Sequence, residues 1–262
     1  MSGAARETAR AHKLVEVRDV KKNFGSVQAL KGVSLSIRDG EVCAIVGDNG
    51  AGKSTLVKIL TGAHQPSSGT IAIEGREVAL HNPDEARRLG IEALFQDLAL
   101  ADDLTIWQNL YLGRELTWGG PLRFVRKRAM SQQARHMLDG LHMNIPSVDA
   151  KVRKLSGGQR QAVAIARAVG WKARLTILDE PTAALGLRER TAVEDLIERL
   201  RDQGRTFLLV SHNFDQVMRL SNEIWAMRNG RVVGHRRTAE TTGDELVALI
   251  TGAKASEFHY SA

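Results

Sequence analysis

Apolar residues follow two different patterns along this chain of 262 residues. At residues 14–20 and 33–37 they occupy alternate positions, which is typical of β-strands with one exposed face. Residues 42–46, 175–178 and 207–210 are apolar at nearly every position, which predicts strands covered on both faces. A chain of this length with strands of both kinds is expected to form one large α/β domain.

Shorter patterns predict further elements in the first hundred residues. These are strands at 69–73, 77–80 and 91–95 and a helix that begins at 82–88, with Pro83 in its first turn. The polar stretch at 21–28 is interpreted as a turn that carries one aromatic residue, Phe24.

Residues 97–152 have a mainly helical pattern. Two apolar stripes are expected there, formed by Leu104, Trp107, Leu110 and Tyr111 and, in a helix at 131–141, by Ala134, Met137, Leu138 and Leu141. Such stripes usually pack in a core, so we interpret this stretch as a helical insertion in the α/β domain.

A glycine-rich loop separates the buried run at 42–46 from a predicted helix at 56–60. Its spacing is that of a phosphate-binding P-loop, in which backbone N–H groups and the helix N-terminus surround a phosphate. We expect Lys53 to reach the β- and γ-phosphates and the Ser54 hydroxyl to ligate Mg²⁺. The alternative is a glycine-rich turn that binds nothing. The candidate contacts are Gly47, Asn49, Gly50, Ala51, Gly52, Lys53, Ser54 and Thr55.

Two paired features in the second half of the chain could also serve a nucleotide. Leu-Ser-Gly-Gly-Gln at 155–159 precedes an Ala-rich helix, so Ser156 either caps that helix or helps to form a second anion site. Asp179 and Glu180 end a buried strand, and adjacent strand residues point to opposite sides. Asp179 therefore suits Mg²⁺ and Glu180 the activation of water, although acids there could also cap a helix.

Two single residues have alternative interpretations. His212 ends the strand at 207–210, where parallel sheets bind ligands, although a lone histidine is usually structural. The Phe24 ring could pack at a strand end or provide a platform for an adenine ring.

Composition narrows the class of protein only modestly. The net charge is +7, with a basic cluster at 123–128, and we favour a solvated surface over a nucleic-acid face. Cys43 is the only cysteine, which excludes an intramolecular disulfide. Because it lies within an apolar strand, we expect it to be a small buried residue. No apolar run approaches the length of a membrane span. Residues 1–13 are expected to form a flexible tail.

Taken together, these motifs resemble an ABC transporter ATP-binding subunit over residues 14–234. The resemblance implies an α/β fold of the P-loop NTPase type, with a RecA-like core, an antiparallel β subdomain and an inserted helical subdomain at about 97–154. It implies an ATPase domain at 14–235 and a C-terminal helical tail at 236–262.

The resemblance also implies roles for individual residues in binding and hydrolysing ATP with Mg²⁺. Lys53, Gln96, Glu180 and His212 would be catalytic, Phe24 would stack on adenine, and Ser54, Gln96 and Asp179 would serve the metal. In a head-to-tail homodimer the partner's ATP would be contacted by Ser156, Gly157, Gly158 and Gln159.

A finer resemblance is to monosaccharide importers of the ribose, xylose and fructose type, and includes Gly186 where most ABC ATPases have Asp. It implies a separate transmembrane permease, a periplasmic or extracellular solute-binding protein and a peripheral place on the cytoplasmic face of the inner membrane. Two alternatives are the ATPase subunit of another importer or an exporter, and a soluble ABC ATPase acting on nucleic acid. We expect no nucleic-acid partner, because ABC ATPases that act on nucleic acid usually carry two cassettes in one chain or a long coiled-coil insertion, and this sequence shows neither.

Overall fold

The computed structural model describes residues 12–119, 124–140, 145, 147–171, 173–183 and 185–253. The strands are β1 (Lys13–Phe24), β2 (Val27–Arg38), β3 (Val42–Val46), β4 (Ser68–Ile73), β5 (Arg76–Val78), β6 (Ile91–Leu94), β7 (Leu175–Asp179), β8 (Thr206–Val210), β9 (Glu223–Arg228) and β10 (Arg231–Arg237). The helices are α1 (Lys53–Leu60), α2 (Pro83–Arg88), α3 (Ile106–Tyr111), α4 (Lys127–Asp139), α5 (Gly157–Val169), α6 (Leu187–Asp202), α7 (Phe214–Leu220) and α8 (Gly243–Thr251). Short 3₁₀ turns lie at Val152–Lys154 and Thr238–Glu240.

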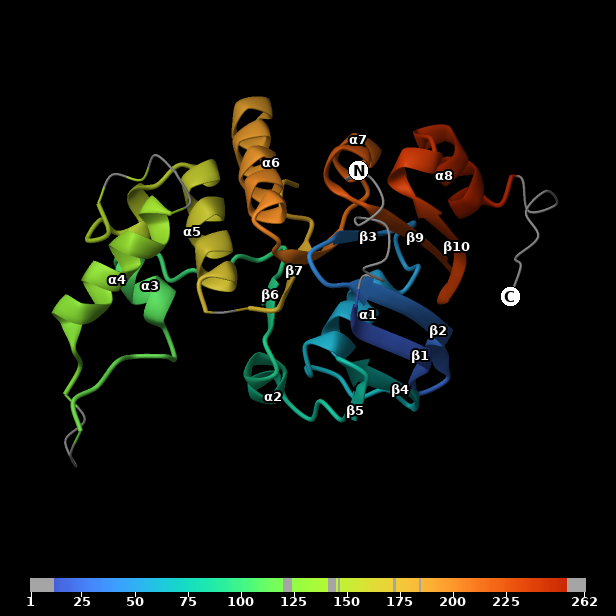
Figure 1. Ribbon diagram of the computed structural model, residues 1–262, viewed down its shortest axis with the longest axis horizontal. Helices are drawn as coiled ribbons and strands as arrows, with labels where there is room; N and C mark the ends of the chain where they lie inside the picture. The colour runs from blue at the N-terminus through green and yellow to red at the C-terminus, as the bar shows by residue number, and fades with distance from the viewer. Residues whose placement is uncertain are drawn as a thin grey trace, which may run out of the picture.

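Two sheets organise the molecule, and their order confirms the predicted α/β fold. One is an antiparallel sheet in the order β2-β1-β4-β5, and the other has the order β10-β9-β3-β8-β7-β6. In the second sheet every pair is parallel except β9 and β10. Helices α6, α7 and α8 cover one face of the larger sheet, and α1 and the smaller sheet lie against its other face (Figure 1).

The central strand β3 contributes to a hydrophobic core on each face. Val42, Ala44 and Val46 belong to the core shared with the helices, whereas Cys43 and Ile45 belong to the core shared with the smaller sheet. All five are at most 1% exposed, which explains why this strand is apolar without interruption. Cys43 is a free, buried thiol, as the sequence predicts.

The turn predicted at residues 21–28 is wrong. β1 continues to Phe24, which pairs with Val27 at the start of β2, and the chain reverses at Gly25, whose φ is +57°. This end of the hairpin is exposed or half-buried, so polar side chains are compatible with strand there. Backbone pairing, rather than burial, maintains the strand, and a hydrophobic pattern cannot reveal it.

Other element boundaries differ from the predictions by a few residues. β5 is Arg76–Val78 rather than 77–80, and β6 ends at Leu94. The predicted helix at 82–88 is present as α2, capped by the Asn82 side chain, which accepts from the Glu85 N–H at 3.0 Å.

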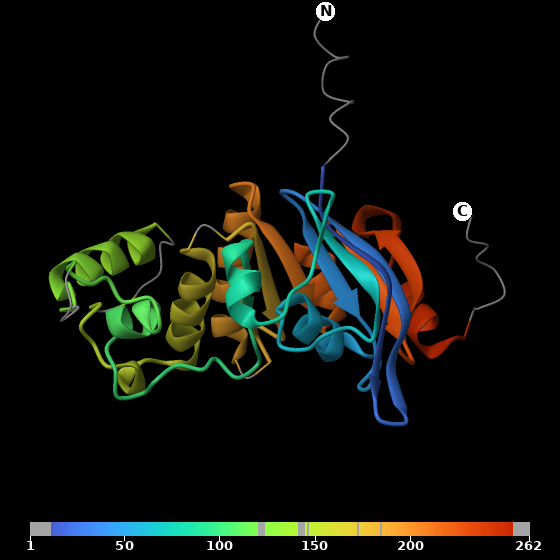
Figure 2. The same ribbon diagram turned by 90° about the horizontal axis from the view of Figure 1, so that it is seen from below.

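The helical region is less helical than predicted. Within the described part of residues 97–152, α-helix is confined to α3 and α4, and α4 begins at Lys127, before the predicted position 131. Leu98 and Leu100 lie in a loop but pack against the core. Apolar loop residues of this kind resemble the buried positions of a helix when only the sequence is considered. Figures 1 and 2 place α3 and α4 at one end of the molecule, beside α5 and away from the smaller sheet.

Several expectations concern residues that the structure does not describe. These are residues 1–11 of the expected N-terminal tail, Arg123 in the basic cluster, Leu141 at the end of a predicted helix, and residues 254–262. β10 continues to Arg237, two residues past the expected end of the ATPase domain at 235. Among the described residues, no helix is both long enough and apolar enough to span a membrane.

Asn109 is the main polar anchor of this helical region, and its replacement tests that role. The side chain is fully buried; it accepts from the Ala101 N–H at 2.7 Å and donates to the Ala101 and Thr105 carbonyls at 3.0 Å each. Asn109→Ala should cost about 2–3 kcal/mol, since backbone groups lose their partners, and lower the melting temperature by roughly 4–12 °C. Differential scanning calorimetry measures this, with exposed Gln132→Ala as the control. Equal melting temperatures would contradict the assignment.

Candidate active site

The site is assembled at one edge of the larger sheet by strand register. Val210 of β8 pairs with Ile45 of β3 on one side and with Asp179 of β7 on the other. The glycine-rich loop, Glu180 and His212 all follow this row within one to three residues along their own chains. The carboxyl ends of parallel strands thus bring together three predicted motifs that are far apart in sequence.

The glycine-rich loop has the backbone conformation that its glycines permit. Gly47 has φ +155° and Gly52 has φ +101°, and a Cβ on Gly47 would collide with the Met227 carbonyl oxygen. Gly52 is the N-cap of α1 and provides no side-chain cap. The first N–H groups of α1 therefore remain available for an anion.

Lys53 bends back over the loop. Its Nζ donates to the carbonyls of Gly47 at 2.6 Å and Asp48 at 3.0 Å. Burial lowers the pKa of the Lys53 ammonium group, and the carboxylates of Glu180 and Asp179 act in the opposite direction. This cation therefore lies in the field of both predicted carboxylates.

A cavity of about 480 Å³ joins Phe24 to the loop, within the size range of ligand sites. Its lining includes the predicted contacts Phe24, Asn49, Gly50, Ala51, Gly52, Lys53, Ser54 and Thr55. The Phe24 ring is 44% exposed and meets the edge of His64, with centroids 5.4 Å apart. Lys22 Nζ lies over the ring, 5.0 Å from its centroid, and the ring belongs to neither hydrophobic core, so its role as a platform for adenine stays a prediction.

The two carboxylates at the end of β7 have different surroundings. Burial, followed by the nearby Glu180, raises the pKa of Asp179, and Lys53 opposes this. Glu180 has φ +52°, an uncommon conformation for a residue with a side chain, and its N–H donates to the Val210 carbonyl at 2.9 Å. Its Oε1 lies 2.7 Å from His212 Nδ1 and accepts from the His212 backbone N–H. The predicted acid and histidine are therefore in direct contact.

The residues of the predicted second anion site lie apart from the P-loop. Ser156 caps α5, and its side chain and that of Gln159 form a reciprocal capping box, while the role of this segment as an anion site stays a prediction. The described lining of the cavity at the P-loop includes none of residues 156–159. Figure 1 shows α5 beyond β7 and β6 as seen from α1, so this chain's own loop and its Ser-Gly-Gly segment do not meet.

Sequence reasoning missed Glu189, which already uses one of the α5 donors. The Gly158 N–H donates to Glu189 Oε1 at 3.1 Å. This backbone hydrogen bond is the main cause that lowers the pKa of the Glu189 carboxyl group, with burial opposing it and the Ser156 hydroxyl adding to it. The only sequence signal was an acid in the first turn of the helix that follows Gly186.

The remaining metal candidates are few. Gln96 is exposed, two residues beyond β6, whose Leu94 pairs with Leu178 of β7. In the described ranges no group of three or more His, Cys, Asp or Glu side chains could hold a metal. Mg²⁺ is compatible with such a site, because it commonly takes one or two protein oxygens together with phosphate oxygens and water.

Known proteins resemble the chain over nearly its whole length. A family model described as "ABC transporter" matches residues 30–183. The xylose/arabinose import ATP-binding protein of Sulfolobus acidocaldarius is 44% identical over 91% of this chain and 94% of that protein. The fructose import ATP-binding protein of Rhizobium meliloti is 40% identical, covering 92% and 95%. A ribose import ATP-binding protein of Yersinia pestis is 41% identical over 93% of this chain, which spans only 47% of that protein.

Solved structures agree with the fold. A nucleotide-free ATP-binding cassette from an ABC transporter superposes with a TM-score of 0.79 at 27% identity, covering 94% of this chain and all of that one. A dimeric cassette in a post-hydrolysis state, bound to ADP and Pi, has a TM-score of 0.72 at 27% identity and covers 86% and 98%.

The exposed ring of Phe24 gives a direct test of the cavity. Phe24→Ala should weaken nucleotide binding roughly tenfold, through the loss of a stacking surface, and leave turnover at saturation mostly intact. Phe24→Tyr keeps the ring and should be nearly silent. Isothermal titration with ATP measures the dissociation constants, and an unchanged value for Phe24→Ala would return the ring to a packing role.

Proposed function

The chain belongs to the ABC transporter ATP-binding family, and on that premise we propose that it hydrolyses ATP to drive import of a monosaccharide through a separate membrane permease. One observation carries the proposal: strand register places the glycine-rich loop, Asp179, Glu180 and His212 at one edge of the sheet. The sugar-import relatives support the direction of transport and the class of solute.

We assign the binding roles by position in the cavity. Phe24 offers its exposed face to the adenine, the loop and the uncapped start of α1 offer N–H groups to the phosphates, and Lys53 offers its charge. Ser54, Gln96 and Asp179 are the protein groups that would hold Mg²⁺, directly or through water. The bound cation would supply charge neutralisation on the phosphate oxygens.

Glu180 is the group proposed to orient or deprotonate the attacking water. Glu180 has an unusual φ, and one of its carboxylate oxygens contacts His212, which lies just beyond β8. His212 would turn from this oxygen to the γ-phosphate when ATP is bound. Asp179 ends β7, where burial raises the pKa of its carboxyl group and a nearby cation would stabilise the charged form.

We propose that the complete site needs a second copy of the chain. Ser156, Gly157, Gly158 and Gln159 are separated from their own P-loop, and in a head-to-tail dimer they would face the partner's ATP. The dimeric cassette among the solved structures supports this arrangement. ATP would then compete with Glu189 for the Gly158 N–H.

The permease and the solute-binding protein follow from the importer assignment, and the chain would act as a peripheral subunit at the cytoplasmic face of the inner membrane. Gly186, the N-cap of α6, supports the sugar-importer subgroup. A Cβ at this position would meet no atom within 4 Å, so steric exclusion does not explain the glycine.

Glu180→Gln is the test of hydrolysis. The amide keeps the shape of the side chain but cannot take a proton, so ATP should bind while phosphate release falls by roughly 10²-fold or more. ATP with Mg²⁺ should then hold the dimer closed. Phosphate release and analytical ultracentrifugation provide the measurements, with the exposed Glu77→Gln as the matched control. Near-normal turnover, or monomer alone at saturating ATP-Mg²⁺, would count against the proposal.

Mixed dimers test whether the site is shared. Lys53→Ala and Ser156→Arg should each inactivate a homodimer, but in the mixed dimer both defects would fall on one composite site. The other site combines an intact Lys53 with an intact Ser156, so the mixture should regain phosphate release in the presence of the permease. Differential tags confirm that mixed dimers form. Activity no higher than the sum of the two inactive variants would show that Ser156 does not act across the interface or that the sites are obligately coupled.

A further inference from the structure

A basic cluster in the helical region has no part in the proposed function. Residues 116–138 include four arginines and one lysine but no aspartate or glutamate. Arg126, Lys127 and Arg128 are exposed. Among the described residues, none of these three forms an ion pair with a carboxylate. This part of the surface therefore carries positive charge that the chain itself does not neutralise.

Large apolar side chains are exposed beside these cations. Trp118 and Phe124 are 61% and 65% exposed, more than any other Phe, Trp or Tyr in the described part of the chain, and Val125 is 43% exposed. The Arg126 guanidinium lies over the Trp118 ring, 4.7 Å from its centroid. We name the following six residues the aromatic-basic patch: Trp118, Phe124, Val125, Arg126, Lys127 and Arg128.

Backbone pairing presents the apolar side chains on both faces of a narrow ribbon. Thr117 and Val125 form an antiparallel bridge, and the Trp118 N–H donates to the Phe124 carbonyl at 2.8 Å. Side chains alternate between the two faces of such a pair. Trp118 and Phe124 therefore share one face of the ribbon, and Val125 lies on the other.

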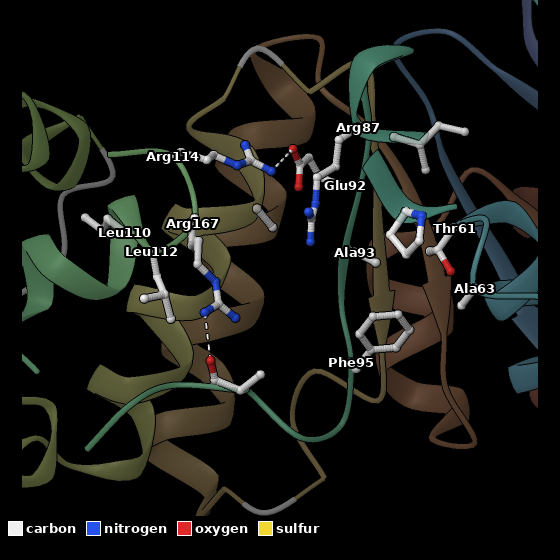
Figure 3. A pocket seen from close by; sticks show the side chains of 15 residues that line it. Thr61, Ala63, Arg87, Glu92, Ala93, Phe95, Leu110, Leu112, Arg114 and Arg167 are labelled. Atoms are coloured by element: carbon white, nitrogen blue, oxygen red, sulfur yellow. Dashed lines mark hydrogen bonds and ion pairs between the residues drawn. The ribbon is translucent and has the colours of Figure 1, made fainter. Parts of the chain in front are cut away.

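The base of this ribbon is fixed to the rest of the molecule. Arg114 pairs with Glu92 of β6 at 2.6 Å (Figure 3). Leu116 packs against the core, and its N–H donates to the sulfur of the fully buried Met130 at 3.3 Å. The ribbon lies at the end of the molecule that carries α3 and α4, away from the smaller sheet (Figures 1 and 2). The patch is thus held at an outer part of the molecule, where a large surface can reach it.

We propose that the aromatic-basic patch binds the surface of a bilayer that contains anionic phospholipids. The inference rests on the proposed function, which brings the chain to a membrane, and it names a contact that needs no permease. Aromatic rings suit the headgroup level of a bilayer, and cations beside them are attracted by anionic headgroups. The patch combines both kinds of side chain within eleven positions of the chain.

Two features favour a bilayer over other partners of negative charge. A nucleic acid could use the cations and stack on the rings, but a partner laid against one face of the ribbon would leave the apolar side chain on the other face exposed. The interfacial layer of a bilayer surrounds what enters it, so it would cover Trp118, Phe124 and Val125 together. The lack of carboxylates at 116–138 removes the repulsion that anionic headgroups would otherwise exert.

Membrane binding at this place would orient the chain. Lys127 and Arg128 belong to the first turn of α4, so headgroups that hold them also hold that helix. The pair between Arg114 and Glu92 connects the base of the ribbon to β6 of the larger sheet. The lipid surface would therefore set the angle at which the helical region meets the membrane, in addition to any contact with the permease.

Vesicle binding tests the charges. The full chain is mixed with protein-free vesicles of equal parts phosphatidylcholine and phosphatidylglycerol, or of phosphatidylcholine alone, and bound protein is measured by co-sedimentation. We expect binding to the anionic vesicles that weakens in high salt, and a loss of roughly tenfold or more in the double variant Lys127→Gln/Arg128→Gln. The control, Arg76→Gln/Arg205→Gln, removes two exposed charges elsewhere and should bind like the unmodified chain.

Fluorescence locates the contact. Vesicles whose lipids carry bromine close to the headgroup quench tryptophans that enter the interface, so they should quench the unmodified chain. Trp118→Phe keeps an apolar ring and should bind within about twofold, but lose most of that quenching. Phe124→Ser should weaken binding by roughly tenfold, whereas Val247→Ser, at an exposed apolar position of α8, should not. Thermal unfolding shows whether each variant is folded, and the quenching of the unmodified chain and of Trp118→Phe is decisive if Phe124→Ser is not.

Several results would overturn the inference. They are equal binding to neutral and anionic vesicles, equal losses in the two double variants, quenching that persists in Trp118→Phe, and tighter binding to an RNA oligonucleotide than to the vesicles. The last would assign the patch to nucleic acid, provided that it is lost in Lys127→Gln/Arg128→Gln. If the unmodified chain hydrolyses ATP but does not bind anionic vesicles, this inference fails alone. If it binds them through the patch but does not hydrolyse ATP, the proposed function fails alone.

Discussion

The parallel pairing of β3, β8 and β7 is the constraint on which the rest of the structure depends. Because Ile45, Val210 and Asp179 lie in one row, a shift of one residue in either pairing would separate the glycine-rich loop from the carboxylates. The row is held by burial on both faces, since side chains of these strands alternate between two cores. The packing of these buried strands therefore fixes the geometry of the site.

Different interactions shape the candidate ATP site and the boundary between the larger sheet and the helical region. At the P-loop, backbone N–H groups and a single lysine act together, and their positions follow from φ values that only glycine adopts easily. At that boundary the contacts are made by long arginine side chains, as in the pair between Arg114, which follows α3, and Glu92 of β6. Contacts of the first kind are fixed by the backbone, whereas those of the second depend on the positions of long, flexible side chains.

The sequence predicts the parts of this protein that are local in the chain. The buried strands, the P-loop and the acid pair after β7 each depend on neighbouring residues, and the resemblance to a family orders them. Only the end of the β1–β2 hairpin, residues 21–28, is wrongly predicted as a turn, because it is polar and held by backbone pairing. Glu189 accepts from the Gly158 N–H, 31 positions away in the sequence. Arg167 donates to the Ala99 carbonyl, 68 positions away. A local pattern of residues cannot predict contacts between positions so far apart in the sequence.

Phe24 has a consequence for how this protein could change its nucleotide. The ring stands at the end of a polar hairpin and belongs to neither core, so its replacement would remove the proposed contact with adenine and, within the protein, the contacts with His64 and Lys22. Glu180, in contrast, is tied to β8 through its N–H and to His212 through its side chain. With the roles proposed above, substitutions at Phe24 would alter the preference for the base without endangering the fold, while the groups proposed to act at the phosphates would stay in place.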